Sequence, residues 1–140
     1  LRDQIKIMAS GKIITGFDIA KAMSLGADTC YSARGMMFAL GCIQALQCDS
    51  GKCPVGIATQ DKALYKGLDI TEKSVRVAHF HNNTLKAFAE FIGACGFDSP
   101  KAITPDVFYR RIDHKTNESF ASLFFNDFEN KVKTEKINLN

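Results

Sequence analysis

The chain has 140 residues, of which 46% are hydrophobic and 24% are charged, a balance typical of a soluble globular domain with its own core. Its formal net charge is only +3, and the Lys and Arg residues are scattered rather than gathered into a basic stripe. The composition therefore gives no indication of nucleic-acid binding. The longest mainly apolar run, residues 35–43, is far shorter than the roughly 20 residues of a membrane-spanning helix, so this piece contains no predicted membrane segment.

The five cysteines are an odd number, and three of them lie within residues 42–53 while Cys30 and Cys95 stand apart. This distribution fits a disulfide framework poorly and favours metal-bound thiolates in a reducing cytoplasm. The sequence starts at Leu1 without an initiator Met, and its first residues resemble the end of a helix running into a strand. We therefore expect the C-terminal part of a longer polypeptide, whose N-terminal part is a necessary partner.

The first 40 residues alternate between strand and helix patterns. Residues 5–9 form a short apolar strand candidate, and a helix follows with Thr15 or Asp18 as its cap and Gly26 at its C-terminal end. Residues 27–31 predict a second strand, and a second helix is expected from Met36 to Leu40. This order predicts a βαβα unit with parallel strands and a right-handed crossover.

The strongest helix signal covers residues 71–95, with Thr71 as the N-cap and Gly96 as the stop. Its predicted buried stripe consists of Val75, Ala78, Leu85, Phe88, Ala89 and Ile92. Residues 61–66 predict one or two helical turns. Short helices are expected to start at Pro100 and Pro105, the second running to about Arg111. A terminal helix is expected over 117–130, and a polar tail from 131.

Small residues follow each predicted strand, at Ser10-Gly11 and at Ser32-Ala33-Arg34. Glycine lets the backbone approach a ligand, and the N–H groups at a helix start favour an anion. Because the carboxyl ends of adjacent parallel strands lie side by side, the two turns could form one phosphate site, with Arg34 adding a charge-assisted contact. The alternative is ordinary turn chemistry, in which Gly11 only tightens a turn and Arg34 is a surface charge.

The segment from Cys42 to Pro54 has the spacing C-x5-C-x4-C-P. Closely spaced cysteines on a short polar loop are typical ligands of an iron–sulfur cluster, and three of them suffice for a three-iron cluster. Zinc is the main competitor but usually takes four protein ligands in a structural site. The nearest candidates for a fourth, His79 and His81, are two positions apart on the long helix and so face different directions. Three unligated small side chains are the remaining alternative.

Four segments carry a more specific signal. They read ASGKIITGFD at 9–18, GAD at 26–28, SARGMMFALGC at 32–42 and CPVGIATQ at 53–60. Together with the long helix, they closely resemble the FMN-binding domain of the glutamate synthase family over about residues 1–112. The cysteine spacing separates this pattern from other flavin-binding barrels, such as the hydroxy-acid oxidases, which share only the phosphate turns.

The resemblance implies an α/β fold, the C-terminal part of a (β/α)8 TIM barrel in which the two predicted strands are the seventh and eighth. Residues 1–112 would be barrel domain with the cysteine loop 42–54, and residues 113–140 a mainly helical extension ending in the polar tail. The FMN phosphate would be bound by Ser10, Gly11, Ala33 and Arg34. A 3Fe-4S cluster would be held by Cys42, Cys48 and Cys53.

The resemblance also implies an oxidoreductase that acts on CH–NH2 donors. Electrons would pass from ferredoxin or an NAD(P)H-linked partner subunit through the cluster to FMN. Reduced FMN would then deliver a hydride to the 2-iminoglutarate formed from 2-oxoglutarate and ammonia, giving L-glutamate. The first six strands, most 2-oxoglutarate contacts and the glutaminase domain are missing here, so the chain identifies no catalytic residue and is expected to be inactive alone. Its short polar ending resembles the smaller glutamate-synthase-related proteins.

Two other interpretations remain open at the level of sequence. One is a non-catalytic module in which Cys42, Cys48 and Cys53 hold zinc or a structural cluster. The other is an FMN barrel that oxidises a hydroxy acid, which predicts flavin but no iron.

Overall fold

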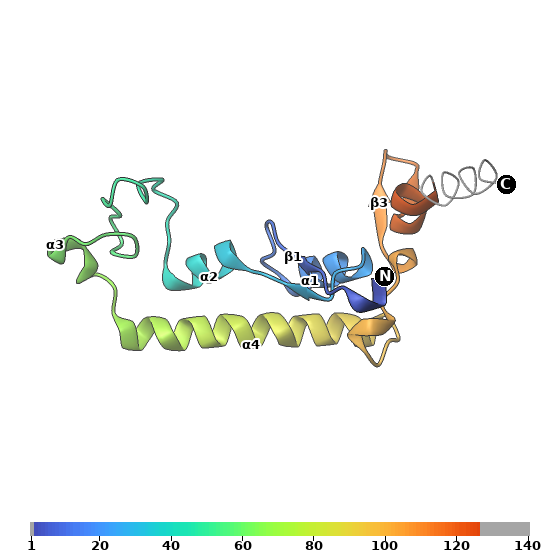
Figure 1. The fold of residues 1–140 in the computed structure, drawn as a ribbon, viewed down its shortest axis with the longest axis horizontal. Helices are drawn as coiled ribbons and strands as arrows, with labels where there is room; N and C mark the ends of the chain where they lie inside the picture. Colours follow the sequence, from blue (N-terminus) through green and yellow to red (C-terminus); the bar gives the residue numbers. More distant parts are fainter. Residues whose placement is uncertain (1, 127–140) are drawn as a thin grey trace.

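The computed structural model describes residues 2–126, which form a mixed α/β structure arranged along one long helix (Figure 1). In chain order its elements are the 3-10 helix Arg2–Gln4, β1 (Met8–Ala9), α1 (Gly16–Ser24), β2 (Thr29–Cys30), α2 (Ala33–Leu40), α3 (Lys62–Tyr65), α4 (Ile70–Ala94), the 3-10 helices Pro100–Ala102 and Pro105–Val107, β3 (Tyr109–Arg111) and β4 (Asn117–Ser119). Residues 120–126 are helical.

The strands β1 and β2 pair in parallel, with Met8 opposite Thr29 and Ala9 opposite Cys30, and α1 connects them. The predicted order strand, helix, strand, helix is therefore confirmed. Both strands are shorter than predicted, although hydrogen bonds from the Asp28 N–H to the Ile7 carbonyl (2.8 Å) and from Tyr31 to Ala9 (2.8 Å) continue the pairing at each end. Short strands are expected where a pair has no neighbouring strand to extend the ladder.

The helix α1 starts with a capping box. The Thr15 hydroxyl accepts a hydrogen bond from the Asp18 N–H (3.2 Å), and the Asp18 carboxylate accepts one from the Thr15 N–H (3.0 Å). Thr15 is thus the N-cap, and Asp18 is its partner three residues later, which resolves the two predicted options. Leu25 is the C-cap, and Gly26 follows with φ +105°, the left-handed conformation in which glycine ends helices.

Two predicted helix starts are wrong. The N-cap of α4 is Asp69 rather than Thr71, because the Asp69 carboxylate accepts a hydrogen bond from the Glu72 N–H at 2.9 Å and Thr71 already lies within the helix. Aspartate and threonine are both good caps, so the sequence offered two starts two residues apart. The helix α2 begins at Ala33, three residues before the predicted Met36, and this places Arg34 in its first turn.

The predicted buried stripe of α4 is also largely wrong. Of its six residues, Ile92 is buried and Phe88 is half-buried, but Val75 and Leu85 are 50% and 45% exposed. The face of α4 that packs against α1 and α2 instead carries the partly buried Val77, Phe80, Thr84 and Phe88 together with the buried Ile92. Apolar side chains occur around much of this helix, so its periodicity does not determine which face is covered.

The helices α1 and α4 approach each other closely at Gly16. A Cβ atom at this position would lie 2.5 Å from the Phe88 backbone nitrogen and 2.9 Å from its Cα. We expect Gly16→Ala to lower the free energy of unfolding by about 1–3 kcal/mol, because one backbone must shift to relieve the overlap. Denaturant unfolding of the full-length polypeptide measures this change.

Gly93 provides a matched control for that substitution. It lies within α4, and a Cβ atom there would meet nothing within 4 Å among the described residues. Gly93→Ala should raise the free energy of unfolding by roughly 0.5–1 kcal/mol, since alanine is the better helix former. Equal stabilisation by both substitutions would contradict the close approach of α1 to α4.

The core lies where α1, α4 and the C-terminal segment meet. Its buried side chains are Ala20, Ile92, Ile103 and Phe108, with partly buried Phe88, Phe91, Phe97, Val107 and Phe120 around them. Phe108 is 2% exposed, and its ring centroid lies 5.4–5.7 Å from those of Phe17, Phe91 and Phe120. The segment after residue 98 therefore packs on the domain and completes its core.

The C-terminal segment contains a β-hairpin that the sequence prediction missed. The strand β3 occupies Tyr109–Arg111, where a helix was predicted, and β4 occupies Asn117–Ser119, where the terminal helix was predicted to start. The Asp113 carboxylate accepts hydrogen bonds from the Lys115 and Thr116 N–H groups (2.7 and 2.8 Å) and stabilises the turn. A helix does begin at residue 120, and the rest of the predicted helix and the polar tail lie outside the described residues.

Among the helices of residues 2–126, none is long and apolar enough to cross a membrane.

Large apolar side chains are exposed around the β1–β2 pair, which has no third strand within residues 2–126. They include Ile5, Ile7, Met8 and Tyr31. We expect the 140-residue chain expressed alone to aggregate, because open strand edges and uncovered apolar surface favour association. Size-exclusion chromatography with light scattering tests this, and a monomer that unfolds cooperatively would contradict it.

Candidate functional site

The two predicted phosphate turns come together in the structure. A cavity of about 270 Å³ lies at the carboxyl ends of β1 and β2 and contains all four residues predicted to bind phosphate. It is lined by Ser10, Gly11, Lys12, Ile13, Tyr31, Ala33 and Arg34. The juxtaposition follows from the parallel pairing, which brings the ends of both strands to one edge of the sheet.

Local backbone geometry holds the two turns against each other. Gly11 has φ +111°, a conformation that glycine adopts without strain. The Ser32 hydroxyl does not cap α2 but donates a hydrogen bond to the Ile13 carbonyl at 2.6 Å, 19 residues away. This bond joins the first turn to the start of α2, so the relative position of the two halves of the cavity is fixed by a direct contact.

The charge of this cavity favours an anion. Its lining includes the cations Lys12 and Arg34 and no carboxylate. The first turn of α2, which contains Ala33 and Arg34, adds the unpaired N–H groups and the positive end of a helix dipole. The four predicted residues therefore lie in surroundings that fit a phosphate group.

Lys12 was not among the predicted site residues. It has φ +56° directly after the positive φ of Gly11, so a lysine occupies a left-handed position that costs roughly 1 kcal/mol more for it than for glycine. Tyr31 also lines the cavity and was predicted only as the last residue of the second strand. Lys12 follows Gly11 and Tyr31 precedes Ser32 in the sequence. Their position next to the predicted turns was the one sequence feature that could have identified them as lining residues.

A second cavity of about 460 Å³ lies on the other side of the α2 N-terminus. It is lined by Ala33, Arg34, Met37, Phe38, Cys42, Gln44, Leu46 and Cys48. Two of the three predicted metal ligands, Cys42 and Cys48, therefore share one cavity. Because Ala33 and Arg34 line both cavities, the start of α2 is the wall between them.

The backbone of the cysteine loop presents N–H groups to sulfur. The Gln44 N–H donates a hydrogen bond to the Cys42 Sγ at 3.5 Å. Cys53 is buried, and backbone N–H groups lower the pKa of its thiol. The Ala58 N–H has the largest effect, and those of Val55, Ile57 and Gly56 add to it, while burial acts in the opposite direction. Burial raises the pKa of the Cys30 thiol, which no prediction involves. The loop thus favours the thiolate form at Cys53.

The three loop cysteines do not converge on one point in the part of the chain that the structure describes. Within residues 2–126 no three His, Cys, Asp or Glu side chains lie close enough together to hold a metal ion. Cys48 is exposed, and Gln44 and Leu46 between Cys42 and Cys48 have positive φ angles of 58° and 56°. The thiol chemistry fits an iron–sulfur cluster, but the loop would have to contract for three sulfurs to reach it.

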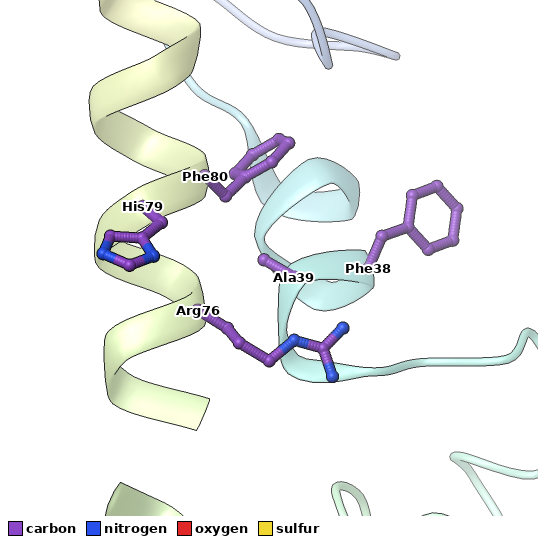
Figure 2. A pocket seen from close by; sticks show the side chains of 5 residues that line it. All are labelled: Phe38, Ala39, Arg76, His79 and Phe80. Carbon is purple, nitrogen blue, oxygen red and sulfur yellow. The ribbon is translucent and has the colours of Figure 1, made fainter. Parts of the chain in front are cut away.

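Of the two histidines considered as zinc ligands, His79 lines a different cavity from Cys42 and Cys48. His79 lines a third cavity, of about 370 Å³, between α2 and α4, together with Phe38, Ala39, Arg76 and Phe80. Figure 2 shows Phe80 reaching from α4 toward α2, and Arg76 extending across the end of α2. His79 therefore gives no fourth ligand beside Cys42 and Cys48, which line a different cavity.

Comparison with known proteins agrees with the resemblance to the glutamate synthase family. A family model described as a conserved region in glutamate synthase matches residues 1–98. The glutamate synthase large subunit-like protein YerD of Bacillus subtilis (strain 168) is 44% identical over 114 residues, which cover 81% of this chain and 22% of the relative. The archaeal glutamate synthase [NADPH] of Methanocaldococcus jannaschii is 40% identical over 103 residues, covering 74% of this chain and 20% of the relative.

A shorter match is found in a eukaryotic enzyme. The glutamate synthase [NADH] of Schizosaccharomyces pombe is 47% identical over 66 residues, or 47% of this chain and 3% of the relative. The chain spans about a fifth of the length of the first two relatives. The family match covers more than two thirds of the chain and includes both predicted phosphate turns and the cysteine loop. This chain belongs to the glutamate synthase family.

Proposed function

We propose that the chain is part of an FMN-dependent oxidoreductase of the glutamate synthase type. In this proposal β1 and β2 are the seventh and eighth strands of a (β/α)8 barrel, residues 1–112 belong to the barrel domain, and residues 113–140 form an extension. The parallel pairing of β1 with β2 and the cavity at their carboxyl ends support it, since ligands of barrels bind at that end. The preceding strands would cover the exposed edge of β1.

The observation that carries the proposal is the cavity at the two turns. Ser10, Gly11, Ala33 and Arg34, chosen from the sequence, all line it, and its cationic lining suits a phosphate. In the proposal, Arg34 binds a phosphate oxygen, the α2 N–H groups complete the anion site, and Gly11 lets the backbone approach closely. The Ser32 hydroxyl keeps the two turns in register through the Ile13 carbonyl.

The cysteine loop would hold a 3Fe-4S cluster through Cys42, Cys48 and Cys53. Two observations support this role, the shared cavity of Cys42 and Cys48 and the lowered pKa of Cys53. Because the three sulfurs are apart, binding of the cluster would close the loop, and the free energy of binding would order it. Free thiols of this kind require a reducing compartment, and on that ground we place the protein in the cytoplasm.

The proposed reaction is reduction of 2-iminoglutarate, formed from 2-oxoglutarate and ammonia, to L-glutamate. When bound, the cluster would relay electrons from ferredoxin or an NAD(P)H-linked partner, and FMN would supply the hydride. The residues of this chain would hold the phosphate end of the cofactor and the electron relay. The wall that both cavities share, Ala33 and Arg34, would keep the two groups close together.

An activity assay of the full-length polypeptide tests the proposal. With a chemically reduced electron donor, 2-oxoglutarate and ammonium ions, it should form L-glutamate, and omission of ammonium should abolish the product. Oxidation of a 2-hydroxy acid with no dependence on iron would instead identify a hydroxy-acid flavoenzyme. Absence of both activities from a protein that contains zinc would indicate the non-catalytic module.

A further inference from the structure

Lys12 combines a left-handed backbone with a place in the lining of the cavity. A tight turn does not need a lysine, and a solvated surface lysine does not need either feature. The backbone of Lys12 is in the left-handed region, with φ +56°, immediately after Gly11 with φ +111°. Lys12 also contributes to the lining of the 270 Å³ cavity, together with Ser10, Gly11 and Arg34. A second glycine would make the same turn without strain, so the turn alone does not explain a lysine here.

The charge of Lys12 is not used elsewhere in the described structure. Among the carboxylates whose side chains the structure describes, none lies within ion-pair distance of Lys12, whereas Lys6 and Lys21 pair with Asp28 (3.6 Å) and Asp18 (3.4 Å). Arg34 in the same cavity has no partner among these carboxylates either. Two unneutralised cations on one small cavity raise its affinity for an anion of more than one charge.

We propose that Lys12 binds the phosphate group of the ligand as a second cationic contact besides Arg34, and so gives this site its preference for a phosphorylated flavin over an unphosphorylated one. This inference rests on the proposed function for the nature of the ligand. A flavin mononucleotide carries a phosphate close to two negative charges at neutral pH, and Arg34 alone would neutralise one of them. The strained backbone of Lys12 is then retained because its charge acts on the ligand.

The test measures binding of two flavins to the apo form of the full-length polypeptide by quenching of flavin fluorescence. Lys12→Gln removes the charge but keeps most of the side-chain length. It should raise the dissociation constant for FMN about tenfold and leave that for riboflavin unchanged, because riboflavin has no phosphate. Lys12→Arg should keep FMN affinity within about twofold. Lys101→Gln, at an exposed lysine outside the cavity, serves as the matched control.

A second variant separates binding from folding. Lys12→Gly should raise the melting temperature of the apo protein, because glycine removes the backbone strain, and should still weaken FMN as Lys12→Gln does. If Lys12→Gln binds FMN as tightly as the wild type, or weakens both flavins equally, the inference is wrong although the proposed function stands. If the wild-type protein binds no FMN at all, the proposed function fails together with it.

Discussion

Replacement of Cys48 by serine in the full-length polypeptide is expected to remove nearly all of the iron while most of the FMN remains bound. Cys48 is exposed and shares the 460 Å³ cavity with Cys42, but it does not line the cavity proposed for the phosphate. Loss of one of three thiolates should leave too few ligands to retain a cluster. Electron transfer from the external donor to the flavin should fall by several orders of magnitude for the same reason.

Iron and flavin analysis of the purified variant, with stopped-flow reduction by the donor, measures both effects. Cys95→Ser is the matched control, because Cys95 caps the C-terminal end of α4 outside the loop, and it should retain iron and donor reactivity. Iron retained in the Cys48→Ser protein together with normal reduction of the flavin would show that the ligand assignment is wrong.

Replacement of Phe108 by alanine should cost about 3–5 kcal/mol of unfolding free energy, the range found when a buried phenylalanine is truncated. Phe108 is 2% exposed and contacts rings from α1, α4 and the helical segment after β4, at centroid distances of 5.4, 5.5 and 5.7 Å. The cavity left behind would be bounded by elements from three distant parts of the sequence, which cannot all collapse into it. Denaturant unfolding of the full-length polypeptide, followed by far-UV circular dichroism, gives the change.

Tyr109 provides the control for this substitution. It is the next residue in the chain but is 67% exposed, so Tyr109→Ala should change the free energy of unfolding by less than about 1 kcal/mol. A Phe108→Ala effect as small as that of the tyrosine would mean that the C-terminal segment does not stabilise the domain.

The parts of the fold that depend on local sequence were predictable. The glycine turn at Gly11, the capping residues Thr15 and Asp18 and the alternation of short apolar strands with helices each reflect interactions within a few residues. Parallel strands then bring their carboxyl ends together by geometry alone. For this reason the sequence could bring Ser10, Gly11, Ala33 and Arg34 together at one site.

The parts that depend on distant contacts were not predictable. The long helix α4 has apolar side chains on more than one face, and only packing against α1 and α2 determines that Val75 and Leu85 stay exposed. The hairpin of β3 and β4 was missed because Pro105 and the later phenylalanines also fit a helix, and the Asp113 turn is a weak signal. Hydrogen-bonded pairing of the two strands overrode that local preference.

The cysteine loop lies between these cases. Its spacing predicted a metal site, whereas the described structure leaves the three sulfurs unassembled. Residues 41–61 have no regular helix or strand, so little in the chain itself fixes the relative positions of Cys42, Cys48 and Cys53. A ligand that binds all three cysteines would supply the missing constraint.

In our proposal, the intact protein holds FMN and a three-iron cluster next to each other. Anaerobic purification of the full-length polypeptide, followed by visible and electron paramagnetic resonance spectroscopy and by iron and flavin analysis, tests it most directly. We predict flavin absorption bands over a broad cluster shoulder, a resonance from the oxidised cluster, and about three iron atoms per flavin. A colourless protein that contains zinc instead of iron, or a flavoprotein without iron, would contradict the account.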